Sequence, residues 1–356
     1  MVFKAMEKID FVIPWVDGAD SRWKSEKGRY EKLLLPGGSS PDESTSADEL
    51  KDQNADCRYR DLGFLRYWFR GIEQFAPWVN RIFFVTCGQK PTWLNTEHPK
   101  LVMVNHCDYI PQEYLPTFNA NTIELNFHRI EGLSEHFVYF NDDMFLLQPV
   151  TPDYFFKNGD PVLLSSLKYP NYLGINNWSH LVFNDYCLVN SKHDIGKSIW
   201  RNRQKWFSVK ALGWHRAFRN VLCYLANKSL PVGNYDHLAL PHLKSTLAET
   251  WEKGFEELDH ASSFKFRSDE QVNQWLFCAW NQAIGRFSPA QSGERGIRIG
   301  ISPLNIDWIC GVIEGRTYPQ VCLNDTQGNT DPVACSEKII DSFNRILPQK
   351  SSFELE

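Results

Sequence analysis

The sequence lacks the paired cysteine spacings that hold a structural zinc ion or define a disulfide framework. Its nine cysteines are an odd number and lie far apart, at positions 57, 87, 107, 187, 223, 278, 310, 322 and 335. We therefore expect free thiols and a reducing compartment. The sequence also lacks an apolar N-terminal segment of signal-peptide length, and no uncharged stretch approaches the roughly 18 residues of a membrane span. We expect a soluble, cytoplasmic protein, and peripheral docking on a membrane is compatible with these absences.

Positive charge is not in excess either, because the formal net charge is −5. A chain without a basic field is not expected to bind nucleic acid. Of the 356 residues, 42% are apolar and 14% are aromatic, which is enough for a sizeable core and excludes a disordered chain. Thirteen tryptophans and thirteen tyrosines fit a large aromatic core, although aromatic faces also stack on sugar rings.

Short apolar runs alternate with helical patterns in the first 140 residues. Runs at 9–16, 81–87, 101–105 and 137–140 are typical of buried strands, and helical periodicity lies between them at about 59–75 and 121–133. This alternation predicts an α/β fold with a mostly parallel, Rossmann-like sheet and flanking helices. Ligands of such sheets bind beyond the carboxyl ends of the strands. Asp17, Gly88 and Asp142–Asp143 follow predicted strands, so we expect them to converge.

We predict three parts along the chain. Residues 1–160 form the first half of an α/β core, with a polar loop at 36–49. Residues 161–235, rich in Trp, Asn and basic side chains, form a helical lid or acceptor-side subdomain. Residues 236–356 complete the core, with helical patterns at about 242–257, 269–284 and 336–346.

The sharpest local signal is Asn141-Asp142-Asp143, directly after the apolar run Phe-Val-Tyr-Phe. Two adjacent carboxylates at the end of a buried strand repel each other unless a cation neutralises them. Mg²⁺ and Mn²⁺ prefer such hard oxygen ligands, and the phosphates of a nucleotide sugar can complete their coordination. A solvated acidic turn or a helix N-cap is the alternative interpretation.

Single basic groups offer weaker signals. Pro241-His242 resembles a helix start. The five-residue step from His237 to His242 does not place both rings on one helical face, so a metal site built on this pair of histidines is not supported. A single histidine can accept a proton from a hydroxyl, but it can equally be an ordinary buried residue. Ser268 and Gln271 resemble a capping box, so Arg267 would stand beside a helix N-terminus where phosphate binds. A solvent-facing arginine is the alternative.

Two further groups of polar residues are compatible with either a structural or a functional role. Arg129 and Glu131 lie on the helical stretch that leads into the strand before Asp142. Asn324-Asp325 lies in a polar loop and, taken alone, indicates a turn; it could also supply a metal ligand.

Taken together, these segments resemble the Stealth family of sugar-phosphate transferases, which includes bacterial capsular polysaccharide phosphotransferases and the catalytic part of the animal GlcNAc-1-phosphotransferase. Four blocks carry the resemblance in order: Ile9 to Asp20, Arg58 to Asp143, Asp236 to Glu270, and Cys322 to Asp325 with the tail Ser351 to Glu354. The second block is the most specific, with Arg58-Tyr-Arg-Asp-Leu, His128-Arg-Ile-Glu-Gly-Leu-Ser134 and Tyr139-Phe-Asn-Asp-Asp143. The chain lacks the large insertions of the animal enzyme and is similar to a compact bacterial member.

The resemblance implies a glycosyltransferase-A-like fold, a nucleotide-sugar donor (a UDP-sugar, such as UDP-GlcNAc, is favoured) and a glycan acceptor. It implies attack on the sugar-linked phosphate, a phosphodiester product and a released nucleoside monophosphate, in capsule or other cell-surface polysaccharide synthesis. It carries the base onto His242, phosphate binding onto Arg267, and Mg²⁺ or Mn²⁺ binding onto Asp142, Asp143 and Asp325. The substrate-binding residues that we expect are Asp17, Gly18, Arg66, Gln89, Asn119, Arg129 and Glu131.

Two other functions are considered. A metal-dependent glycosyltransferase would attack the anomeric carbon and release a nucleoside diphosphate, and its fold and Asp-Asp motif would be the same. A catalytically silent carbohydrate-binding module would need neither donor nor metal, and the predicted convergence of Asp, His and Arg argues against it.

Overall fold

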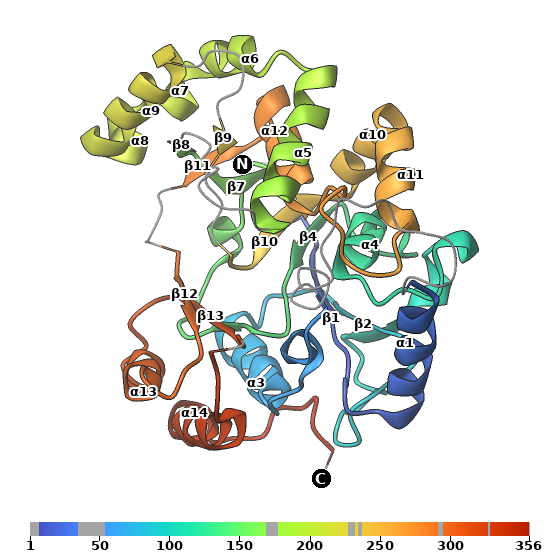
Figure 1. The fold of residues 1–356 in the computed structure, drawn as a ribbon. Helices are drawn as coiled ribbons and strands as arrows, with labels where there is room; N and C mark the ends of the chain where they lie inside the picture. Colours follow the sequence, from blue (N-terminus) through green and yellow to red (C-terminus); the bar gives the residue numbers. More distant parts are fainter. Residues whose placement is uncertain are drawn as a thin grey trace.

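The computed structural model describes residues 7–34, 54–168, 177–226, 232–233, 237–290, 295–326 and 328–355 (Figure 1). The polar loop expected at 36–49 and the residue Asp236 lie outside this range. All nine cysteines lie within it and are free. Among the described helices, none is long and apolar enough to cross a membrane.

A five-stranded sheet forms the centre of the molecule, in the order β10-β4-β1-β2-β3. Its strands are β1 (Ile9–Pro14), β2 (Ile82–Thr86), β3 (Leu101–Asn105), β4 (His136–Tyr139) and β10 (Leu240–Leu243). All neighbours are parallel except β10, which runs antiparallel to β4 at the edge. The expected α/β class, the mostly parallel sheet and the four predicted strands are confirmed.

Residues 241–242 were expected to open a helix, and this expectation is wrong. They lie in strand β10, and helix α10 (Lys244–Lys253) begins after it. Pro241 has no backbone N–H, which an edge strand tolerates because one side of it has no partner strand.

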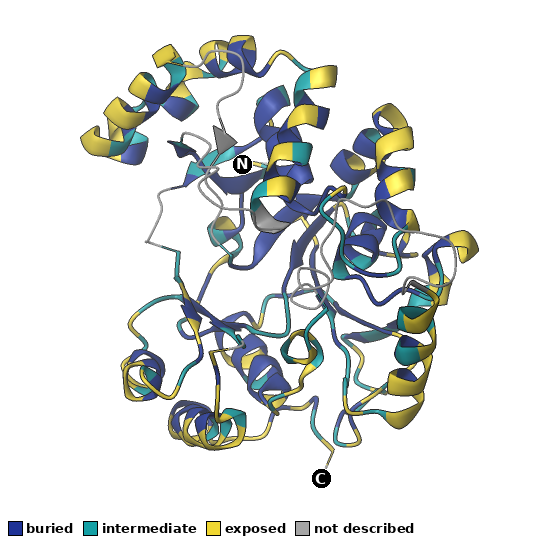
Figure 2. Cartoon of the chain, viewed as in Figure 1, coloured by how far each residue is buried: buried dark blue, intermediate teal, exposed yellow. Residues whose placement is uncertain are grey.

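Helices cover both faces of the central sheet, as the continuous apolar strands require. Phe11 and Ile13 of β1 pack into one core cluster with α3 (Leu65–Phe75) and α14 (Pro332–Ile346). Val12, which points the other way, packs into a second cluster with α10 and α12 (Trp275–Ile284). Figure 2 shows the sheet buried and the outer faces of the helices exposed.

A second, three-stranded sheet begins directly after the acidic turn that follows β4. Strand β5 (Met144–Leu146) pairs antiparallel with β13 (Gln320–Asn324), which pairs in parallel with β12 (Ile297–Gly300). The register sets Cys322 opposite Met144. Residues Cys322 to Asp325, which belong to the fourth block of the family resemblance, therefore lie beside the Asp142–Asp143 turn.

Residues 161–235 are largely helical where they are described, as expected. Helix α5 shares the second core cluster with β2 and β4 of the central sheet, and β7 pairs in parallel with β11 from the last third of the chain. The division of the chain into three parts therefore stays a prediction. The elements of this region are β7 (Asp160–Leu164), β8 (Leu167–Lys168), α5 (Asn177–Lys192), α6 (Ile195–Arg201), α7 (Arg203–Trp206), α8 (Val209–Leu212), α9 (Trp214–Ala226), β9 (Val232–Gly233) and β11 (Ser288–Ala290).

The remaining elements are α1 (Ser21–Leu34), α4 (Ala120–Leu125), β6 (Phe156–Lys157), α11 (Phe255–Ser263), α13 (Ile306–Glu314) and the 3₁₀ turns η1 (Asp56–Tyr59), η2 (His106–Asp108), η3 (Gln112–Tyr114), η4 (Phe127–Arg129) and η5 (Pro152–Tyr154). They include α4 and η1, which border the cleft described below.

Candidate active site

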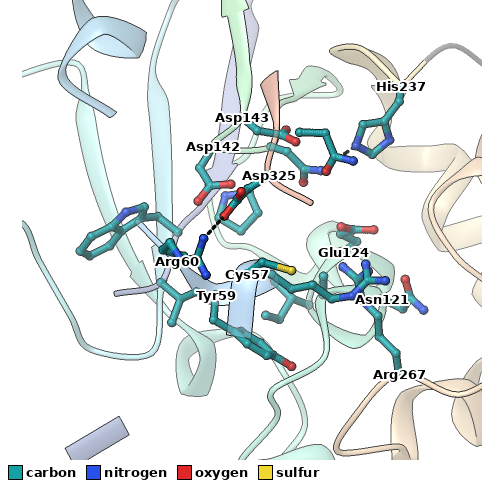
Figure 3. Close-up of a pocket in the computed structure, with 18 of the residues that line it drawn as sticks. Cys57, Tyr59, Arg60, Asn121, Glu124, Asp142, Asp143, His237, Arg267 and Asp325 are labelled. Carbon is teal, nitrogen blue, oxygen red and sulfur yellow. Dashed lines mark hydrogen bonds and ion pairs between the residues drawn. The ribbon is translucent and has the colours of Figure 1, made fainter. Parts of the chain in front are cut away.

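A cleft of about 1280 Å³ lies beyond the carboxyl ends of β1 and β4. Its wall includes Trp15 after β1, the Asn141–Asp143 turn after β4, Asp325 after β13, and Arg267. Figure 3 shows these carboxylates and the guanidinium around one cavity. The sheet therefore brings together side chains that are far apart in the sequence, at the edge where parallel sheets bind their ligands.

Asp142 and Asp143 lie side by side in the turn between β4 and β5. The pKa of Asp142 is raised to about 8, mainly by burial and then by the charges of Asp143 and Asp61. Three carboxylates that crowd one end of the cleft repel one another, and a cation bound among them would remove this repulsion.

The protein holds one carboxylate oxygen of Asp143, and the other has no partner in the part of the chain that the structure describes. Its Oδ2 accepts a hydrogen bond from the Cys322 thiol at 3.3 Å, and its backbone carbonyl accepts from the Leu323 N–H at 2.8 Å. Its Oδ1 is buried and has no hydrogen-bond partner among the described residues. A buried, unpartnered carboxylate oxygen is costly unless a ligand contacts it, so the Asp142–Asp143 turn fits a divalent cation.

His237 lies beside Asp143 in the same cleft. A ring nitrogen of His237, a carboxylate oxygen of Asp143 and the sulfur of Cys322 all lie within 4.8 Å of one another. Burial raises the pKa of Cys322 well above its usual value, and Asp143 adds to this effect, so the thiol is protonated and donates to the carboxylate. Burial lowers the pKa of His237, which keeps the ring neutral, while Asp143 acts in the opposite direction.

A chain of hydrogen bonds runs from His237 to Glu124 at the other wall of the cleft. The Asn141 side-chain amide contacts the His237 Nε2 at 3.5 Å, and the Tyr139 hydroxyl bonds both Asn141 and, at 2.5 Å, the Glu124 Oε1. Burial raises the pKa of Glu124 to about 7, although the Tyr139 bond lowers it. The chain fixes the orientation of the His237 ring.

Arg267 lines the cleft opposite the acidic turn, but it does not precede a helix. Ser268 and Gln271 do contact each other, with the Ser268 N–H donating to the Gln271 Oε1 at 3.1 Å, yet the next helix begins only at Trp275. The expected helix N-terminus is therefore wrong, and the positive group at this point is the guanidinium alone.

Asp325 also lines the cleft, with both carboxylate oxygens already engaged. Its Oδ2 forms an ion pair with Arg60 at 2.9 Å, and its Oδ1 accepts from the Asn329 amide at 2.8 Å. Metal binding by Asp325 stays a prediction, and it would require exchange of the Arg60 contact.

His242 is not brought to the cleft. It lies on β10 with 2% of its surface exposed, and its ring packs against Phe137 and Phe277 at centroid distances of 5.5 and 6.0 Å. Burial lowers its pKa to about 4. The geometry expected for His242, facing the phosphates, is therefore wrong, because the strand register turns this side chain into the core.

Asp17, Gly18 and Gln89 hold the end of β1 rather than line the cleft. The Asp17 N–H donates to the Gln89 Oε1 at 2.9 Å, and the Gln89 amide donates back to the Asp17 carbonyl at 3.0 Å. The Gly18 N–H donates to the Tyr59 carbonyl at 2.9 Å. These contacts position Trp15 and Tyr59, which do line the cleft.

The variant Gly18→Ala is expected to lower Tm by roughly 2–6 °C, because overpacking costs about 1–3 kcal/mol. A Cβ at position 18 would lie 2.2 Å from the Tyr59 carbonyl oxygen. Gly28→Ala in α1 is the matched control, since its Cβ meets nothing within 4 Å. Thermal unfolding of both variants measures the effect, and equal Tm values for the two would contradict the close approach at Gly18.

The other four residues expected to bind substrate also lie outside the cleft lining. The buried Asn119 donates to the Phe266 carbonyl at 3.0 Å and to the Gln271 side chain at 3.0 Å, so it holds the loop that carries Arg267. Arg66 stacks over Trp93 and Arg129 over Trp251, while Glu131 is exposed. Their substrate-binding roles stay predictions.

Three residues of this region were not predicted from the sequence as site residues: His237 and Glu124, which line the cleft, and Cys322, which is buried behind Asp143. His237 was considered only as a metal partner of His242, and its position beside Asp143 depends on the chain entering β10. Cys322 opens the fourth block of the resemblance, which was the available signal. Glu124 had none, because its burial depends on packing against Tyr139.

Comparison with known proteins identifies two family regions in the chain. Residues 7–34 match Stealth protein conserved region 1, and residues 58–162 match Stealth protein conserved region 2. These regions include β1, the cleft turn 141–143 and Glu124.

The chain is similar over nearly its full length to bacterial phosphotransferases. It is 37% identical to the capsular polysaccharide phosphotransferase WcwK of Streptococcus pneumoniae, covering 98% of this chain and 99% of that protein. It is 38% identical to the receptor polysaccharide phosphotransferase WefC of Streptococcus gordonii, covering 98% and 100%. Among solved structures, the galactosyltransferase LgtC aligns with 96% of this chain and 98% of its own, at 10% identity and a TM-score of 0.40, a likeness too low to support an argument. Because the two phosphotransferases are 37% and 38% identical to this chain over nearly its full length, and two Stealth conserved regions match it, the chain belongs to the Stealth family of phosphotransferases.

Proposed function

We propose that this protein transfers a sugar-1-phosphate from a nucleotide sugar to a hydroxyl of a glycan. The products are a phosphodiester-linked glycan and a nucleoside monophosphate. The names of its relatives, capsular and receptor polysaccharide phosphotransferases, support a glycan of the bacterial cell surface as acceptor. We place the reaction in the cytoplasm as part of the same proposal. A UDP-sugar carrying a hexose or N-acetylhexosamine, such as UDP-GlcNAc, is the donor that we favour.

The observation that carries the proposal is that one cleft holds the carboxylates for a cation, a guanidinium for the phosphates and an imidazole that can act as the base. Asp142, Asp143, His237 and Arg267 all line it. Its volume of about 1280 Å³ exceeds the roughly 300–1,000 Å³ of a typical small-molecule site. A cleft of this size can receive a donor and the end of a glycan together.

Asp143, with Asp142 beside it, would hold Mg²⁺ or Mn²⁺ in this proposal. The support is the unpartnered Oδ1 of Asp143 and the crowding of carboxylates around it. When bound, the ion would supply charge neutralisation and Lewis-acid polarisation of the donor phosphates. The other set of nearby atoms, which adds Cys322 and His237, offers softer ligands that Mg²⁺ does not prefer.

In the reaction, His237 accepts the proton of the acceptor hydroxyl, and the hydroxyl oxygen forms a bond to the phosphorus that carries the sugar. The bond between that phosphorus and the oxygen bridging to the nucleotide phosphate breaks, and its electron pair leaves with the nucleoside monophosphate. Arg267 contacts the equatorial phosphate oxygens, where charge is spread in the transition state. The bond between the anomeric carbon and its oxygen is untouched, so the anomeric configuration of the sugar is retained.

Incubation with a panel of nucleotide sugars, Mg²⁺ or Mn²⁺ and a glycan acceptor tests the proposal by the nucleotide that is released. We expect a nucleoside monophosphate, separated by ion-exchange chromatography, in amounts equal to the phosphodiester formed. A nucleoside diphosphate would instead support a glycosyltransferase that attacks the anomeric carbon. The same reaction with EDTA is expected to fall to background.

A further inference from the structure

Helices α6 to α9 carry a row of large apolar side chains on the outside of the molecule. These helices form an arch at one end of the molecule, and their outer surfaces are largely exposed (Figures 1 and 2). The exposed apolar residues are Trp200, Val209, Trp214, Phe218, Leu222 and Leu225, each with 49–62% of its surface accessible. Several large apolar side chains exposed on neighbouring helices are typical of a docking site.

On α9 the apolar residues form one stripe. Trp214, Phe218, Leu222 and Leu225 follow one another at steps of four, four and three residues, so they share a helical face. The inner face of the same helix is a different set, in which Asn220 is buried and bonds the Leu167 N–H at 2.8 Å. The stripe is therefore not the face that attaches α9 to the protein.

These helices carry an excess of positive charge, although the chain as a whole has a net charge of −5. Two of their lysines form ion pairs, Lys197 with Asp194 at 2.9 Å and Lys205 with Asp160 at 3.5 Å. Residues 195–235 contain no Asp or Glu. The basic residues of this stretch are Lys197, Arg201, Arg203, Lys205, Lys210, Arg216, Arg219 and Lys228, the last of which lies outside the described residues. A locally basic, acid-free segment on an acidic protein is complementary to an anionic surface.

Exposed basic and apolar side chains alternate along the arch. The Arg203 guanidinium lies 5.8 Å from the ring centroid of Trp200, and the exposed Lys210 follows Val209. Tryptophan and basic residues together are typical of elements that lie in the interface of an anionic bilayer, with apolar groups at the acyl boundary and cations among the headgroups.

We propose that the surface formed by Trp200, Val209, Lys210 and the α9 stripe docks on an anionic lipid bilayer. A second copy of the chain is a poorer occupant, because a symmetric interface would set these cations against their own copies. The docked surface is connected to the cleft: Asn220 of α9 bonds β8, and Lys168 of β8 lines the cleft.

Sedimentation with lipid vesicles tests this proposal without donor or acceptor. We expect the protein to bind vesicles of equal parts phosphatidylglycerol and phosphatidylcholine, to bind less as salt rises, and to stay in solution with phosphatidylcholine alone. The double variant Phe218→Ser, Leu225→Ser is expected to lower partitioning by roughly tenfold or more. Arg201→Gln with Lys210→Gln is expected to weaken it by roughly 30-fold at low salt, because each of the two charges contributes roughly 1 kcal/mol.

The matched control is Leu304→Ser with Trp308→Ser, which removes apolar surface of 98% and 52% exposure on another side of the chain. It is expected to bind vesicles like the wild type. All three variants change exposed side chains, and unchanged Tm values and unchanged turnover with a water-soluble acceptor show that they are folded. Failure of the wild type to sediment with anionic vesicles would overturn the proposal, as would equal losses in the control. Concentration-dependent dimers that the Phe218–Leu225 variant abolishes, without vesicle binding, would assign the surface to a second copy and also overturn it.

Discussion

Asp143→Asn is expected to lower turnover by roughly 10²–10³-fold, the loss seen when one group that stabilises transition-state charge is removed. The amide keeps the size of the side chain and can still accept from Cys322, but it removes the charge that Oδ1 offers to a cation. The concentration of Mg²⁺ or Mn²⁺ needed for half-maximal rate should rise as well. Steady-state kinetics across a metal titration measures both quantities.

Stability should move in the other direction. Loss of the Asp143 charge relieves its repulsion with Asp142, so the Tm of Asp143→Asn is expected to equal or exceed that of the wild type without added metal. Cys322→Ser is the matched control, because a serine hydroxyl can still donate to Asp143 Oδ2, and its turnover should stay within a few-fold of the wild type. Wild-type turnover and metal dependence in Asp143→Asn would remove this residue from the metal site, and a large loss in Cys322→Ser would make the sulfur a ligand.

His237→Gln is expected to lower kcat by roughly 10²–10⁴-fold, the contribution of a general base, with little change in the KM for the donor. The glutamine can still contact Asn141, but it cannot accept a proton at neutral pH. Because the base is lost and not the metal, the concentration of metal needed for half-maximal rate should stay unchanged. Kinetics with saturating acceptor separates these quantities.

His242→Gln is the comparison variant. From the sequence alone, its loss of activity would be expected to exceed that of His237→Gln, because the family resemblance assigns the base to His242. Its ring is buried between Phe137 and Phe277, so the substitution is expected to lower Tm while the folded fraction keeps most of its kcat. If His242→Gln is folded and inactive whereas His237→Gln is active, the base is His242 and the cleft geometry does not describe the working enzyme.

The part of this site that the sequence predicts is the part that local patterns determine. Asp142 and Asp143 follow an apolar strand, and the carboxyl ends of the parallel strands in such a sheet lie at the edge where ligands bind. Phosphate binding by Arg267 was expected from the family resemblance. The local pattern of Ser268 and Gln271 added only a helix start, which the loop does not form. Local patterns therefore predict strands and their ends better than the start of a helix.

The rest depends on pairing that no short pattern reports. Whether a histidine of the 237–242 segment faces the cleft is set by the antiparallel register of β10 on β4, which pairs His242 with Phe137 and leaves His237 before the strand. Glu124 becomes a buried acid only because Tyr139 lies against it. The contact of Cys322 with Asp143 requires β13 to pair with β5, across 179 positions of sequence.

The fate of the phosphate that carries the sugar tests the central claim most directly. A UDP-sugar labelled with ³²P in that phosphate, incubated with the protein, Mg²⁺ and a glycan acceptor, is expected to leave the label in the glycan, resistant to phosphatase, while unlabelled nucleoside monophosphate is released. Label that leaves as nucleoside diphosphate, with none in the glycan, would contradict the account.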